Sequence, residues 1–71
     1  MEYHESLLEQ IESVADYELG EQAFLNVVGG HAVVITAYLI YATHIEYICR
    51  SVEYGIMQLD SVSLCKSPRV V

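Results

Sequence analysis

The N-terminal part of the chain carries hydrophobic residues at steps of three and four, the spacing of one face of a helix. Leu7, Ile11 and Val14 form this apolar face, and Ser6 stands at the capping-box distance from Glu9. Acidic residues follow the same steps on the opposite face, namely Glu5, Glu9, Glu12 and Asp16. The pattern predicts an amphipathic helix over about residues 6–19 with one acidic side.

A second feature is the stretch from Ala23 to Ile45, which contains no carboxylate, lysine or arginine. A seam of residues at alternating steps of three and four passes through this stretch and beyond it, as in helices that pack together. Its members include Val27, Val34, Tyr38, Tyr41, Ile45, Ile48, Val52 and Leu59. Val, Ile, Thr and Tyr are common here and also favour strands, but no second strand of comparable length is evident to pair with this one. We therefore predict a long apolar helix.

Two adjacent glycines, Gly29 and Gly30, interrupt the apolar stretch. Inside a helix they would cost about 2 kcal/mol relative to alanines. They indicate either a kink or break in the helix, or a place where another backbone comes close. After Asp60 the sequence has short polar residues and a proline, which predict an irregular tail over residues 61–71. The expected fold is all-α, a helical hairpin or three-helix arrangement in one domain over residues 1–60.

Composition adds an expectation of self-association. A chain of 71 residues buries only about 60% of the surface that it exposes when unfolded. Yet 54% of its residues are apolar, more than a short monomer easily hides. We expect a homodimer or higher homo-oligomer, joined along the seam.

The net charge of −7 is unevenly distributed, because most acids precede the apolar stretch while Arg50, Lys66 and Arg69 follow it. The acidic face of Glu5, Glu9, Glu12 and Asp16 suits a basic protein partner. Three basic residues against ten acids argue against direct contact with nucleic acid. Two cysteines make no disulfide framework and the acidic N-terminus is no secretory signal, so we expect a cytoplasmic protein.

Catalytic and metal chemistry find little support. His31, His44 and Cys49 are potential ligands, but no Cys-x-x-Cys or His-x-x-x-His spacing occurs. A Cys–His nucleophile pair would need a third residue to orient the histidine, and none is recognisable. We predict no enzyme activity, no metal and no cofactor.

The sequence thus predicts a small acidic, non-enzymatic protein–protein interaction module, an inhibitor, adaptor or regulatory partner, that acts through a helical surface. The alternative is a single-pass membrane protein in which residues 23–45 span the bilayer. At about 1.5 Å per residue this stretch would cross the roughly 30 Å hydrocarbon core. The basic residues would then place the C-terminus in the cytoplasm.

Overall fold

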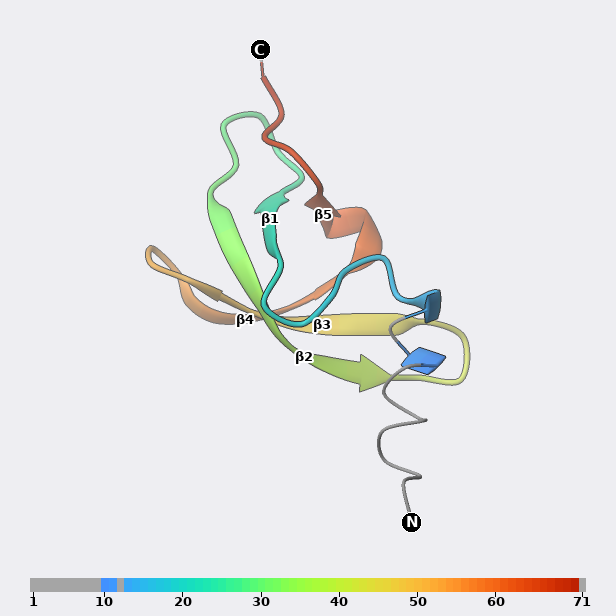
Figure 1. The fold of residues 1–71 in the computed structure, drawn as a ribbon. Coiled ribbons are helices and arrows are strands. Elements are labelled where there is room, and N and C mark those ends of the chain that lie inside the picture. Colours follow the sequence, from blue (N-terminus) through green and yellow to red (C-terminus); the bar gives the residue numbers. More distant parts are fainter. Residues whose placement is uncertain (1–9, 12, 71) are drawn as a thin grey trace.

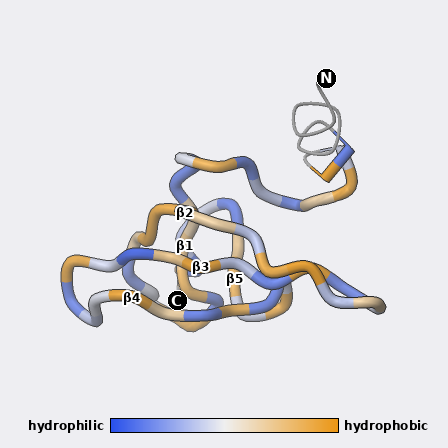
Figure 2. Tube along the Cα trace, turned by 90° about the horizontal axis from the view of Figure 1, so that it is seen from below, coloured by the Kyte–Doolittle hydropathy of each residue, from blue (hydrophilic) through white to orange (hydrophobic). Residues whose placement is uncertain are grey.

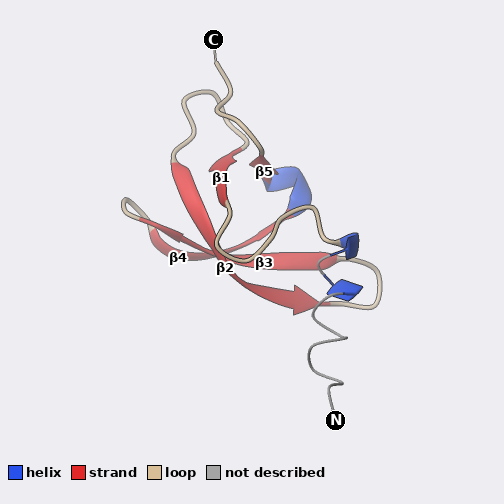
Figure 3. Ribbon diagram, in the orientation of Figure 1, coloured by secondary structure: helices blue, strands red, loops and turns tan. Residues whose placement is uncertain are grey.

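Five antiparallel strands make up the fold in the computed structural model, which describes residues 10–11 and 13–70. In sheet order they are β4, β3, β2, β1 and β5, so the first four strands form a meander and β5 returns to pair with β1. The elements are β1 (Gln22–Leu25), β2 (Ala32–Ile40), β3 (Ile45–Ser51), β4 (Gly55–Asp60), the 3-10 helix η1 (Ser61–Ser63) and β5 (Leu64–Cys65). The sheet curls into a half-barrel (Figure 1), and strands and loops dominate the described chain (Figure 3).

The prediction of an all-α fold is wrong. The apolar stretch from Ala23 to Ile45 holds most of β1, all of β2 and the connections on either side of β2. β2 pairs with the short β1 on one side and, on the other, with a partner of comparable length, β3, which begins only at the end of this stretch and is 7 residues long against 9 in β2. Because a tight turn without glycine or proline joins β2 to β3, the two strands look like one continuous hydrophobic segment in the sequence. Within the described part of residues 1–60, antiparallel strands stand where we predicted long helices.

Burial alternates along the strands, as expected when one face of a sheet covers a core. In β2, Val33 and Ile35 are buried while Val34 between them is exposed, and in β3 Tyr47 and Cys49 are buried. Figure 2 colours the chain by hydropathy, and hydrophobic and hydrophilic stretches follow one another along it. The core inside the curl consists of Tyr17, Ala23, Val33, Ile35, Tyr47, Cys49 and Leu64.

A β-bulge in β2 contributes to the curl. The pairing register shifts between Ile35, which lies opposite Cys49, and Ala37, which lies opposite Ile48. Thr36 is the extra residue, and its hydroxyl donates a hydrogen bond of 3.0 Å to the carbonyl of Ile48. Such a bulge bends its strand and strengthens the local twist.

The two glycines that we considered as a helix break lie in the β1–β2 connection. Gly29 has a φ of 72°, a left-handed conformation that disfavours other residues. Gly30 sits against the backbone of Leu25 and Val27, and its N–H donates to the Val27 carbonyl at 2.8 Å. Of the two possibilities raised by the sequence, close approach of another backbone is the one found here.

Of the predicted acidic helix, residues 6–9 and 12 lie outside the described residues, and the rest is helical only in part. Residues 10–11 and 13–14 are helical, and the N–H of Ala15 donates to the Ile11 carbonyl at 2.8 Å. The chain then bends, because the Tyr17 ring is inserted into the core, where it packs edge-on against Tyr47 with ring centroids 5.4 Å apart. The predicted extension to Leu19 is wrong. Within the described residues, no helix has the length and apolar character needed to cross a bilayer.

The segment after Asp60, where we expected an irregular tail, carries η1 and β5. Beyond β5, Lys66 holds the segment that precedes β1. Its ammonium lies 4.0 Å from the centroid of the Tyr17 ring, donates to a Glu21 carboxylate oxygen at 2.9 Å and also donates to the Asp16 carbonyl. The C-terminal part of the described chain is therefore tied to the first part of the fold.

Candidate binding groove

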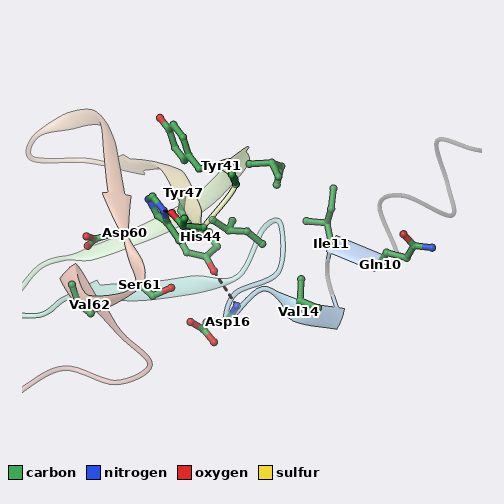
Figure 4. A pocket seen from close by; sticks show the side chains of 14 residues that line it. Gln10, Ile11, Val14, Asp16, Tyr41, His44, Tyr47, Asp60, Ser61 and Val62 are labelled. Atoms are coloured by element: carbon green, nitrogen blue, oxygen red, sulfur yellow. Dashed lines mark hydrogen bonds between the residues drawn. The ribbon is translucent and has the colours of Figure 1, made fainter.

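An apolar groove of about 840 Å³ lies between the segment that precedes β1 and the β2–β3 hairpin (Figure 4). Ile11 and Val14 line one side, while Ile40 and Ile45 line the hairpin side. Val62, from η1, closes the far end. The groove is built from segments that are distant in the sequence, so it exists only in the folded chain.

Several hydrophobic side chains of the groove face water. The exposed fraction is 72% for Val14, 56% for Ile40 and 76% for Val62. Single exposed apolar residues are common on proteins, but a group of them around one hollow is typical of a surface that another molecule covers. At the floor lies Tyr47, which is buried and fixed by the core.

Two carboxylates give the groove a negative character. Asp16 and Asp60 both line it, and within the described part of the chain neither has an ion-pair partner. Asp60 is held in place because one carboxylate oxygen accepts a hydrogen bond of 3.1 Å from the N–H of Ser63 and so caps η1. Asp16 is held by its backbone N–H, which donates to the Tyr47 hydroxyl at 2.9 Å. A cationic group that entered the groove would meet two positioned acids.

The hairpin side is braced by a hydrogen-bond network around the β2–β3 turn. The Tyr41 and His44 rings stack with centroids 4.9 Å apart, and the Tyr41 N–H donates to the His44 carbonyl at 2.9 Å. Glu46 accepts from Gln58 at 2.7 Å and lies 2.7 Å from the His44 ring nitrogen Nε2. Gln58 also donates to the Tyr41 hydroxyl at 3.1 Å. The network connects β3 and β4 to the turn and holds the groove wall in shape.

Glu46, His44 and Thr43 stand in the order carboxylate, imidazole, hydroxyl, with the Thr43 hydroxyl 2.9 Å from the His44 ring nitrogen Nδ1. This is also the order of a hydrolase triad. Here, however, the three residues are near neighbours around one turn, and the side chain of His44 is 45% exposed. A hydrolase assembles its triad beside oxyanion donors in a site that excludes water. We interpret these contacts as part of the hydrogen-bond network around the β2–β3 turn.

Two carboxyl groups are stabilised in their charged form. Hydrogen bonds from Gln58 and His44 lower the pKa of Glu46 below its ordinary 4.5. Hydrogen bonds from the Glu18 N–H and from Lys66 lower the pKa of Glu21 in the same direction. Both effects arise at the surface, where water and salt weaken them.

We therefore expect the free energy of unfolding to fall as the pH is lowered. A folded-state pKa below the unfolded value gives a contribution that is fully present above pH 4.5 and is lost as the pH drops through the folded pKa values of Glu21 and Glu46. Urea titrations through this acidic range would measure the slope. The double variant Glu21→Gln, Glu46→Gln should flatten it, and Glu18→Gln, whose side chain lies outside these contacts, should not. An equally steep slope in the double variant would contradict the assignment.

The structure distributes the predicted site residues over several places. Of the acidic partner face, Glu5, Glu9 and Glu12 lie outside the described residues, and Asp16 lies on the groove. The seam is divided between the two faces of the sheet, because steps of three and four change parity along a strand. Tyr38, Ile45 and Leu59 pack against the core, Ile48 is half-buried, and Val27, Val34, Tyr41 and Val52 are exposed.

The three potential metal ligands are far from forming a common site. The His31 ring packs edge-on against the Tyr54 ring, with centroids 5.4 Å apart, and the His44 ring stacks on Tyr41 at the β2–β3 turn. Cys49 is buried in the core, and this burial raises the pKa of its thiol. Among the residues that the structure describes, no group of three His, Cys, Asp or Glu side chains could hold a metal ion.

Sequence reasoning missed most of the groove, including Ile40, Asp60 and Val62. The turn that shapes it leaves little signal in the sequence, because the run from Tyr41 to His44 contains neither glycine nor proline and its Ala42 favours a helix. No protein-family model matches this chain, and no curated protein or solved structure matches it at a significant level.

Proposed function

We propose that this chain is a small, non-enzymatic protein–protein interaction module whose groove binds a short apolar segment of a partner protein that also carries a lysine or arginine. The observation that supports this most is the joint presence of exposed Val14, Ile40 and Val62 and of the carboxylates Asp16 and Asp60 around one hollow. The partner is a cytoplasmic protein, and the module acts on it as an inhibitor, adaptor or regulatory subunit.

The apolar part of the groove would supply most of the binding free energy. Transfer of one leucine- or isoleucine-sized side chain from water into an apolar site contributes about 2 kcal/mol. Two or three such side chains contribute about 4–6 kcal/mol, and after the cost of ordering the peptide this fits a weak complex with a dissociation constant in about the millimolar range. The hydrophobic groove wall offers room for this at Ile40 and Val62.

The acids would determine which apolar segments bind. A lysine or arginine of the partner would pair with Asp16 or Asp60, whereas an acidic segment would be repelled by both and by the net charge of −7. The full chain should therefore select apolar sequences with a nearby basic residue from a displayed peptide library. Enrichment of acidic or purely polar peptides would contradict the proposal.

A pair of matched variants tests whether the selected peptides occupy the groove. Ile40→Lys places a charge on the groove wall and should weaken a selected peptide at least about tenfold, because a charge in an apolar contact costs more than one factor of ten in affinity. Val52→Lys makes the same change of charge at a fully exposed turn position outside the groove and should bind as the unaltered chain does. Equal binding by both variants would place the peptide elsewhere.

Asp16→Asn and Asp60→Asn test the charge term separately. Asparagine is also a good helix cap, so Asp60→Asn keeps the hydrogen bond that orders η1. The double variant should bind the peptide less tightly, and its affinity should depend less on added salt. An unchanged salt dependence would show that the acids do not contact the peptide.

A further inference from the structure

The outer face of the sheet, opposite the core, carries a pattern of its own. Along β3 the outward residues are Glu46, Ile48 and Arg50, an acid, an apolar residue and a base at every second position. On β2 the flanking residues are apolar: Val34 lies beside Arg50, Ala37 beside Ile48 and Leu39 beside Glu46. On β4, Ile56 lies beside Arg50, Gln58 beside Ile48 and Asp60 beside Glu46, so the end of the row at Glu46 carries a second acid.

This outer face is open to solvent in the described part of the chain. Val34 is 41% exposed and Ile56 is 69% exposed. The segment that precedes β1 lies against the other side of the sheet, where Tyr17 contacts Tyr47 and the Tyr38 hydroxyl donates to the Tyr17 carbonyl at 2.7 Å. The outer face, unlike the core face, therefore has no cover from that segment.

Arg50 stands out on this face. It is exposed, and its side chain makes no hydrogen bond or ion pair with any residue that the structure describes. Glu46, at the other end of the row, uses one carboxylate oxygen toward Gln58 and the other toward His44. Each carboxylate oxygen can accept more than one hydrogen bond, so Glu46 has capacity for a guanidinium group.

We propose that this outer face binds a second copy of the same chain, in a two-fold symmetric dimer with the rows Glu46–Ile48–Arg50 facing each other in opposite directions. A two-fold axis that crosses the strands at Ile48 places Arg50 of each copy opposite Glu46 of the other. It also sets Ile48 against Ile48 and Val34 against Leu39 of the second copy. Each Arg50 then meets Glu46 of the other copy, with Asp60 of that copy beside the contact, while the apolar side chains of β2 meet each other and Ile56 lies next to Asp60 of the second copy.

The charges exclude the other face-to-face arrangement. An axis parallel to the strands would place Arg50 against Arg50 and Glu46 against Glu46, and like charges in contact are unfavourable. The spacing also fits, because four residues of a strand span about 13 Å, so the two Arg–Glu contacts lie on either side of the apolar centre. An isologous interface requires such a self-complementary patch.

The curl of the sheet makes its outer face convex, so contact is closest at the centre and a moderate affinity is expected. Sedimentation equilibrium of the full chain over a wide concentration series should show a reversible monomer–dimer equilibrium that weakens with added salt, because the ion pairs are near solvent. A chain that stays monomeric at every concentration would overturn the proposal.

Charge reversal identifies the face. Arg50→Glu alters a side chain without intramolecular partners, so the variant should keep its circular-dichroism spectrum. It should raise the dimer dissociation constant by about tenfold or more, because two attractive contacts become repulsive. Ile40→Lys, in the groove, should leave dimerisation unchanged. If Arg50→Glu dimerises like the unaltered chain, the outer face is not the interface.

A mixing experiment tests the pairing itself. Arg50→Glu and Glu46→Arg should each be monomeric alone, yet a mixture of the two should form a heterodimer, since each contact again joins opposite charges. Glu18→Arg, which adds the same charge outside the outer face, is the control and should not pair with Arg50→Glu. If Glu46→Arg is not folded by circular dichroism, Glu46→Gln replaces it, because it removes the like charge that faces the new acid of Arg50→Glu, so the mixture should associate more strongly than Arg50→Glu alone. Failure of the folded pair to associate, or association with the control, would contradict this geometry.

Discussion

Replacement of Gly30 by alanine should destabilise the chain more than any other single methyl addition in the β1–β2 connection. A Cβ at this position would overlap the carbonyl oxygen of Leu25 and approach the carbonyl oxygen of Val27 to 2.9 Å. Both are backbone atoms, so no side-chain rotation relieves the overlap. The turn is also held by the hydrogen bond from the Leu25 N–H to the His31 carbonyl at 3.1 Å. Relief therefore requires the connection to open.

The expected loss is about 3 kcal/mol or more of unfolding free energy, at the upper end of overpacking effects. Gly29→Ala is the matched control. Nothing lies within 4 Å of its added Cβ, and only its φ of 72° is unfavourable. That conformation costs an L-residue about 1–2 kcal/mol. Urea unfolding of the two variants would measure the difference, and equal stability of the two would mean that Gly30 is not closely packed.

The second large effect is expected at Tyr47, the largest fully buried side chain. Its ring meets the Tyr17 ring at 5.4 Å and the Tyr38 ring at 5.9 Å, both edge-on. Tyr47→Ala would leave a cavity between three elements and cost about 3–5 kcal/mol. A domain of this size has an unfolding free energy on the order of 4–10 kcal/mol, so the variant should lose a large part of its stability and unfold at a much lower urea concentration.

Tyr47→Phe separates packing from hydrogen bonding. It keeps the ring contacts and removes only the hydroxyl that accepts from the Asp16 N–H at 2.9 Å. The expected cost is about 1 kcal/mol, typical of one lost hydrogen bond. Near-ultraviolet circular dichroism together with urea unfolding would distinguish the two variants. Equal losses would show that the hydroxyl, rather than the ring, secures the segment that precedes β1.

The sequence contained the correct strand signals, but the spacing of three and four residues, which indicates a helix, was given more weight. Val33 and Ile35 alternate with exposed positions in β2, and Tyr47 and Cys49 alternate with half-buried or exposed positions in β3. The apolar residue Val34 lies on the outer face between buried neighbours, which removes the polar half of the alternation and leaves a continuous apolar run. Such a run does not distinguish a strand from a buried helix by periodicity alone. The missing observation was the turn at residues 41–44, which contains neither glycine nor proline.

The groove could not be predicted because it depends on pairs that are remote in the sequence. Asp16 reaches it through the Tyr47 hydroxyl, and Val62 reaches it through η1, which follows β4. Asp16 itself was identified as a partner-binding acid from helical spacing, and it lies on the groove for a different reason, the bend at Tyr17. Residue type was readable from the sequence, but position in space was not.

The order in which the strands pair has a consequence during synthesis. Hairpins β2–β3 and β3–β4 can close as soon as their residues leave the ribosome, since short turns join them. The edge of β1 that faces away from β2 stays unpaired for longer, because its partner β5 lies far along the chain. The Cys65 thiol is 41 positions from the Phe24 carbonyl that it approaches. Until then β1 presents an unpaired edge to other nascent chains. The short β5 thus covers this edge of β1, but it can do so only after the other four strands have been synthesised.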